Sequence, residues 1–145
     1  MSSFPKLSVM ARWTVKEVAA IPTVSDGGPE NPTWYPLQHA LGSDSFGANL
    51  FVATQGGQIL VEDHDEHESG QQELYVVLEG EVAFQLDGEE ARLGRGSAVA
   101  ISDPSVRRSA TALAEGTALL IIGAGPQPFR STWNPAHFSD IPRPG

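Results

Sequence analysis

The chain contains no cysteine among its 145 residues. This absence excludes disulfide bonds, thiolate catalysis and zinc sites built from cysteine. A metal ion, if one is bound, needs ligands from the 4 histidines or from the 18 aspartates and glutamates.

Basic residues and long apolar runs are also scarce. Lysine and arginine number 9 against 18 acidic residues, which gives a formal net charge of −9. Because this charge repels phosphate groups and anionic lipids, nucleic acid and membrane surfaces are poor partners for the chain. No apolar run approaches the roughly 20 residues of a membrane-spanning helix, and the N-terminal residues lack an apolar stretch typical of a signal peptide. We therefore expect a cytoplasmic protein.

The middle of the chain consists of short apolar stretches separated by turns that contain glycine. This regular spacing predicts an all-β fold, an antiparallel sandwich or barrel. We expect strands at residues 48–54, 58–63, 74–79, 81–86, 98–102, 106–111 and 117–123. The Asp87-Gly88 dipeptide predicts a tight hairpin between two of them. Only residues 13–20 suggest a helix, and their β-branched residues weaken that prediction.

Proline concentrates on both sides of this core, in segments 1–45 and 124–145. Because proline lacks the backbone N–H that a central strand needs, these segments are predicted to be arms. They flank the barrel core of a single domain, which covers about residues 46–123. The aromatic residues of the arms include Trp34, Tyr35, Phe129, Trp133 and Phe138. They predict that the arms pack on the barrel or on a second subunit. We expect a homodimer joined through sheet edges or exchanged arms.

The segment GGQILVEDHDEHESGQQELYVVLEG, residues 56–80, gathers the side chains best suited to chemistry. Side chains two positions apart on a strand point to the same side, so His64 and Glu66 are expected to face one side together with Glu73. His67 would then face the opposite side. A bulge in the strand would bring His67 inward in place of Glu66.

This segment resembles the first motif of the cupin superfamily, in which a glycine precedes His-x-His, a glutamate and a second glycine. Glu73 and Gly80 keep the family's six-residue gap, and His64 lies one position from the place of the first histidine. Glu66 stands where the family has its second histidine. The resemblance, which extends over about residues 46–123, implies a cupin jelly-roll barrel with a pocket in its interior.

The family's second motif is only partly kept, in GRGSAVAISDPSVRRSATA at residues 94–112. Arg108 stands where the resemblance places the last metal-ligating histidine. Arginine stays protonated and has no lone pair to donate, so Arg108 cannot be a metal ligand. Its guanidinium could instead pair with Glu73 and Glu66, as a metal ion would, or hold an anionic ligand.

Three functions are compatible with these residues, and the first is binding of a small organic molecule, including an anionic one, without a metal. The polar groups expected in that pocket are His64, Glu66, Glu73, Gln85 and Arg108. A few convergent polar groups on apolar walls are typical of small-ligand sites. Because Arg108 stands where the resemblance places a metal ligand, we favour metal-free binding, without choosing between a binding protein and an enzyme.

The second function is a metal-dependent enzyme, such as an oxygenase, lyase or isomerase. The metal, Fe, Mn, Ni or Zn, would be held by His64, Glu73 and either Glu66 or His67. This alternative needs open coordination positions for a substrate.

The third function is a metal-free epimerase or cyclase. His64 would act as the base beside Glu73, Tyr75 as the acid, and Arg108 as the group that stabilises negative charge. Sugar epimerases of the cupin superfamily provide the precedent by resemblance.

Overall fold

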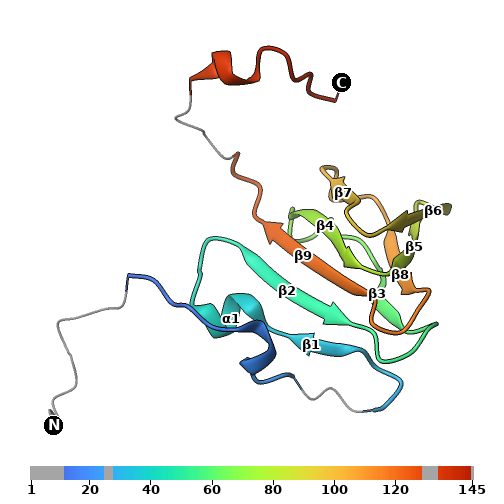
Figure 1. Ribbon diagram of the computed structural model, residues 1–145. Helices are drawn as coiled ribbons and strands as arrows, with labels where there is room; N and C mark the ends of the chain where they lie inside the picture. The colour runs from blue at the N-terminus through green and yellow to red at the C-terminus, as the bar shows by residue number, and fades with distance from the viewer. Residues whose placement is uncertain (1–11, 25–27, 129–133, 145) are drawn as a thin grey trace, which may run out of the picture.

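The structure is a computed structural model that describes residues 12–24, 28–128 and 134–144. Within these residues two antiparallel sheets face each other, and the helices are short (Figure 1). The first sheet has the order β1 (Thr33–Tyr35), β2 (Gly47–Val52), β9 (Ala118–Ala124), β4 (Gln72–Glu79), β7 (Ala98–Ile101). The second has the order β3 (Ile59–His64), β8 (Arg108–Ala112), β5 (Glu81–Leu86), β6 (Glu89–Gly94). The predicted all-β jelly-roll class is confirmed.

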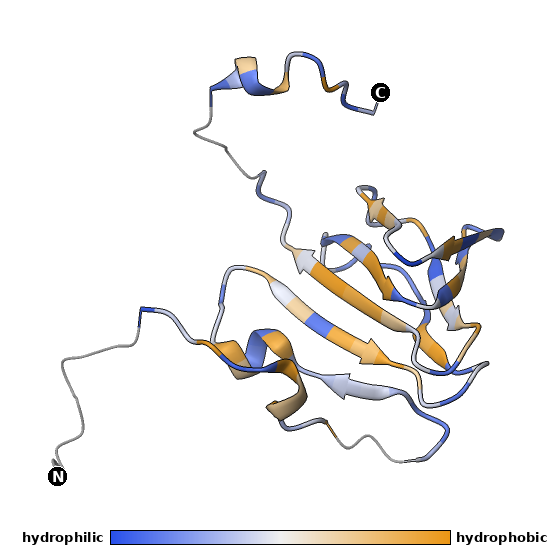
Figure 2. Ribbon diagram, viewed as in Figure 1, coloured by the Kyte–Doolittle hydropathy of each residue, from blue (hydrophilic) through white to orange (hydrophobic). Residues whose placement is uncertain are grey.

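The core lies between the two sheets, where alternate residues of each strand point inward. Tyr75 and Val77 of β4 face Val82 and Phe84 of β5, and all four side chains are buried. The Tyr75 and Phe84 rings meet edge to face, with centroids 5.6 Å apart. Figure 2 shows β9, in the centre of the first sheet, as a nearly continuous apolar strand. Burial of each large side chain contributes about 1.5–3 kcal/mol, so this layer holds the sheets together.

The hairpin between β5 and β6 turns at the predicted dipeptide. Asp87 and Gly88 both have positive φ, 50° and 85°, as a tight hairpin turn requires. Strand β6 itself was not expected, because the alternation in its sequence EEARLG is limited to two apolar residues, Ala91 and Leu93, which pack against the core. It forms because the turn aligns it with β5, from Leu86↔Glu89 to Glu81↔Gly94.

The N-terminal arm differs from the sequence expectation in three ways. Strand β1 adds an edge strand to the first sheet, between the prolines at 32 and 36. Helix α1 (Leu37–Leu41) follows it and ends at Gly42, whose φ is 79°. The helix suggested over residues 13–20 is reduced to the 3-10 turn η1 (Val18–Ala20), in a segment rich in β-branched residues.

Gln58 links this arm to the barrel through hydrogen bonds. Its side chain is buried, and Nε2 donates to the carbonyl oxygens of Pro29 (3.3 Å) and Asn31 (3.4 Å). Its Oε1 accepts from the backbone N–H of Thr54 at 2.8 Å. Further along the arm, the Trp34 ring packs on Phe51 with a centroid separation of 5.6 Å. The arm therefore packs on its own barrel, as its aromatic residues suggested.

The C-terminal segment behaves differently. Residues 134–144 are all exposed, and the short turn η2 (Pro135–Phe138) is capped by Asn134, whose Oδ1 accepts from Ala136 N–H at 3.0 Å. Of the aromatic residues expected to pack, Phe138 is 41% exposed, whereas Phe129 and Trp133 lie outside the described residues. In the part of the chain that the structure describes, no helix is long and apolar enough to cross a membrane.

Candidate functional site

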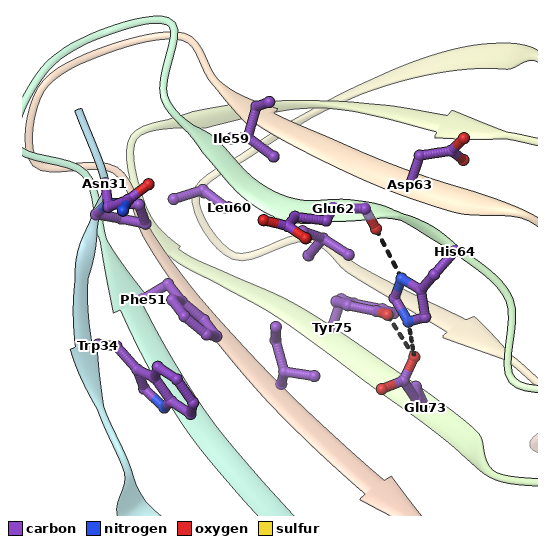
Figure 3. A pocket seen from close by; sticks show the side chains of 13 residues that line it. Asn31, Trp34, Phe51, Ile59, Leu60, Glu62, Asp63, His64, Glu73 and Tyr75 are labelled. Carbon is purple, nitrogen blue, oxygen red and sulfur yellow. Dashed lines mark hydrogen bonds and ion pairs between the residues drawn. The ribbon is translucent and has the colours of Figure 1, made fainter. Parts of the chain in front are cut away.

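A cavity of about 460 Å³ opens between β3 and the inner face of the first sheet (Figure 3). One end is apolar and includes Trp34 from the N-terminal arm and Phe51 from β2. The other end is polar, with His64 at the end of β3, and Glu73 and Tyr75 on β4. The cavity therefore joins an aromatic wall to a cluster of ionisable groups.

His64 connects the polar groups. It is the last residue of β3 and pairs across the sheet with Arg108 of β8. Its Nδ1 lies 2.7 Å from the carbonyl oxygen of Glu62, a distance at which Nδ1–H donates to that oxygen. Its Nε2 is directed at two carboxylates, 3.1 Å from Glu66 Oε2 and 3.9 Å from Glu73 Oε1. The backbone of β3 thereby fixes which ring nitrogen faces the cluster.

Glu66 reaches the cluster from a loop, not from a strand. β3 ends at His64, and the chain then turns so that Glu66 N–H donates to the carbonyl of Pro104 at 2.8 Å. Ser69 Oγ donates to Glu66 Oε1 at 2.9 Å and leaves Oε2 for His64. Glu66 therefore lies beside His64 as predicted. The loop after β3 places it there, not the alternation of side chains along a strand.

Glu73 and Tyr75 share the inward face of β4, two residues apart. Tyr75 OH donates a hydrogen bond to Glu73 Oε1 at 2.5 Å. Burial raises the pKa of the Tyr75 hydroxyl far above its ordinary value, and the hydrogen bond to the Glu73 carboxylate raises it further. Tyr75 therefore stays protonated and acts as a hydrogen-bond donor.

Arg108 is 1% exposed, and it is the first residue of β8. Its Nη1 lies 3.8 Å from Glu73 Oε1, and within the described residues none of its three nitrogens has a hydrogen-bond partner. The next inward positions of β8 are Ala110 and Ala112, small residues that leave space in the core. Arg108 does not line the cavity, so its charge acts on the cavity through Glu73.

The structure brings together five of the residues singled out from the sequence: His64, Glu66, Glu73, Tyr75 and Arg108. It does not bring Gln85 or His67 to them. Gln85 is exposed on the outer face of β5, where its Nε2 donates to Glu90 Oε1 at 3.2 Å. His67 is exposed in the loop after β3, and its backbone N–H donates to Asp65 Oδ1 at 3.0 Å.

Most of the residues that line the cavity were not singled out from the sequence, and Glu62, Phe51 and Trp34 show why. Glu62 lies two positions before His64, so the parity argument applied to His64 would have found it. Phe51 belongs to a predicted strand, but nothing in the sequence identifies which face of that strand meets the cavity. Trp34 reaches the cavity because the arm packs on the barrel, a tertiary contact without a sequence signal.

A family model for the cupin domain matches residues 50–122, about half of the chain. The chain belongs to the cupin family. The two-sheet fold agrees with this assignment. No curated protein matches the chain.

Solved structures with the same fold include the following three proteins. A cupin protein from Bacteroides fragilis has a TM-score of 0.66 and 18% identity, over 86% of this chain and 93% of that chain. A sugar phosphate isomerase of the cupin superfamily from Silicibacter pomeroyi has a TM-score of 0.61 and 17% identity, over 77% and 75%. KdgF from Halomonas sp. has a TM-score of 0.58 and 14% identity, over 73% and 89%. At these identities the likeness establishes the fold alone.

Cupins often bind a metal ion, and the side chains at the polar end of the cavity determine whether one fits here. One atom each from His64, Glu66 and Glu73 could be a ligand, and these atoms lie within 4.8 Å of one another. The fourth neighbour is Arg108, which has no lone pair and keeps its positive charge. Because a divalent ion and the buried guanidinium would compete for the same Glu73 carboxylate, the four residues together fit a metal poorly.

Proposed function

We propose that this cupin binds a small organic molecule in the cavity without the metal ion common in its family. The observation that carries the proposal is Arg108, a buried cation 3.8 Å from the Glu73 carboxylate. A guanidinium at this position neutralises the carboxylate that a metal would otherwise bind.

The cavity supports the binding part of the proposal. Its volume of about 460 Å³ falls within the range of small-molecule pockets. Apolar side chains such as Phe51 and Ile121 give it binding surface, while His64, Glu73 and Tyr75 converge at one end and can orient a ligand. This combination of broad apolar walls and few polar groups suits a molecule of metabolite size.

Elemental analysis of the purified protein tests the metal-free part. We expect much less than one equivalent of transition metal per chain in the wild type, even after incubation with Fe, Mn, Ni or Zn salts and desalting. Arg108→His restores an imidazole facing Glu73 and should increase the retained metal towards one equivalent. Arg107→His is the matched control, because Arg107 pairs with Asp63 on the outer surface. One tightly held metal ion per wild-type chain contradicts the proposal.

A second candidate is a metal-free isomerase or epimerase acting in the same cavity. It is favoured by the way His64 and Tyr75 both contact Glu73, which offers a base and a protonated donor at one end of the pocket. Two proteins with the same fold are a sugar phosphate isomerase and KdgF. Turnover of a bound molecule that is lost in Tyr75→Phe, with binding retained, would favour this candidate over a binding protein.

A metal-dependent enzyme is supported only by the cluster of His64, Glu66 and Glu73. The elemental analysis separates it from the proposed function. Activity that appears with one added metal and disappears with a chelator would establish it.

A further inference from the structure

We propose that the ligand is an organic cation, an amine or another protonated nitrogen group attached to a flat apolar body. This inference rests on the proposed function and names the class of molecule that the cavity accepts. It comes from the charge at the polar end, from the hydrogen-bonding groups left free there, and from the aromatic wall opposite.

The charge at the polar end is negative. The carboxylates there are Glu62 and Glu73, which line the cavity, and Glu66, which contacts His64. The cations near them are Arg108 and, when protonated, His64. Three carboxylates therefore stand against at most two cations, and Arg108 is buried and does not line the cavity. A chain of net charge −9 adds to the same field. Such a site attracts a cation and repels a carboxylate or a phosphate.

The groups left free for a ligand accept hydrogen bonds. Tyr75 OH already donates to Glu73, and His64 Nδ1 already donates to the Glu62 carbonyl. The Glu62 carboxylate lines the cavity and has no hydrogen bond or ion pair from its side chain in the described part of the chain. An ammonium group has three hydrogen-bond donors and no acceptor, so it suits a site whose free groups accept hydrogen bonds.

The opposite wall suits a flat apolar group. Trp34 and Phe51 line it with rings inclined by 31° and centroids 5.6 Å apart. The indole is held in place because Trp34 Nε1 donates to Asn49 Oδ1 at 2.8 Å. Aromatic faces pack against flat ligands and also attract cations, so this wall reinforces the preference of the carboxylates.

Three probes with one shared body test the inference: 2-phenylethylamine, 2-phenylethanol and 3-phenylpropanoate. Binding is measured by calorimetry near pH 7, where the first is a cation, the second neutral and the third an anion. We expect the amine to bind about ten-fold tighter than the alcohol, a gain typical of one good charged contact, and the carboxylate to bind weakest. Higher salt should weaken the amine most.

The Glu62→Gln variant tests whether the amine binds in this cavity. Because Glu62 is exposed and unpaired, this variant should fold normally and lose about five-fold or more in affinity for the amine while keeping its affinity for the alcohol. Glu79→Gln is the matched control, since Glu79 is exposed at the other end of β4, away from the cavity. It should leave all affinities unchanged.

The outcomes separate this inference from the proposed function. If the carboxylate binds tightest, or if the amine binds equally well to Glu62→Gln, the cationic class is wrong and a cavity for small molecules still stands. If none of the three binds, and a thermal-shift screen of neutral sugars, acids and amines also finds no ligand, both the inference and the proposed function fail.

Discussion

Arg108 is the only charged residue that is buried in the described part of the chain. Burial of a guanidinium without hydrogen-bond partners is costly, and the nearby Glu73 carboxylate is the group that offsets the cost. The two charges are therefore expected to stabilise each other, so that removal of one leaves the other buried and unpaired.

Arg108→Ala should lower the free energy of unfolding by about 3–5 kcal/mol, the range found when one partner of a buried pair is removed. Arg107→Ala provides the control next to it in sequence, because its side chain is 55% exposed and pairs with Asp63 at the surface. That substitution should cost no more than about 1 kcal/mol. Urea denaturation measures both. Equal stability of Arg108→Ala and the wild type would contradict the pairing with Glu73.

Tyr75 gives a residue-scale prediction for alkaline pH. Because burial raises its pKa in the folded state above the value of about 10 in the unfolded chain, the unfolded chain releases this proton first as the pH rises. The contribution of Tyr75 to stability is therefore complete below pH 10 and decreases above it.

The absorbance of tyrosinate at alkaline pH measures the ionisation of Tyr75 directly. Wild type and Tyr75→Phe should show the same absorbance rise for as long as circular dichroism reports a folded chain, and should differ by one tyrosine after unfolding. An additional tyrosine that titrates near pH 10 in the folded wild type would show that Tyr75 is not shielded.

At the scale of the elements, the turn between β4 and β5 connects the two sheets just after the strand that carries Glu73 and Tyr75. Gly80 forms this turn with φ of +75°, and an added Cβ would lie 2.8 Å from Thr117 Cα. Thr117 is itself buried, and its Oγ accepts from Glu81 N–H at 3.4 Å. The close approach of the two backbones leaves no room for a side chain at this position.

Gly80→Ala should therefore destabilise the protein more than Gly88→Ala. Both glycines have positive φ, which costs alanine about 1–2 kcal/mol, but a Cβ on Gly88 meets open space. The additional steric cost at Gly80 should bring its loss to about 3 kcal/mol or more. Thermal melts of the two variants give the comparison. Equal melting temperatures would mean that the turn relaxes away from Thr117.

Strands with alternating apolar residues were predictable from the sequence, and so was the Asp87-Gly88 hairpin. Strands β1 and β6 were not, because β1 is short and flanked by prolines, and the alternation in EEARLG is limited to Ala91 and Leu93. Both form through pairing with a neighbouring strand, β2 and β5 respectively. The information for such edge strands lies in the partner and the turn, not in their own residues.

The polar cluster was predictable where a motif fixed the spacing, as for His64 and Glu73. Gln85 was expected in the cavity, but it follows the buried Phe84 along β5 and therefore lies on the outer face. Trp34 was not expected in the cavity, because the arm reaches the barrel through contacts such as those of Gln58, which join residues far apart in sequence.

At the scale of the whole molecule, the part of the first sheet's outer face that lies on β4 is apolar and exposed. Leu74 and Leu78 of β4 are 37% and 42% exposed on this face. Together with the exposed C-terminal segment, they leave apolar surface that a second copy of the chain would cover.

We therefore predict a homodimer, with a mass in light scattering of twice 15.4 kDa at micromolar concentrations. Burial of Leu74 and Leu78 would provide the driving force, so Leu78→Glu should shift the equilibrium towards the monomer. A wild-type mass near 15.4 kDa across that concentration range contradicts this prediction.

A crystal structure of the protein with a bound ligand, purified in the presence of a chelator and measured with anomalous diffraction, tests metal-free binding most directly. We predict an organic molecule in the cavity between the Trp34–Phe51 wall and Glu73, and no anomalous peak among His64, Glu66 and Glu73. A fully occupied anomalous peak at ligand distance, about 2.0–2.2 Å, from His64 Nε2 would contradict it.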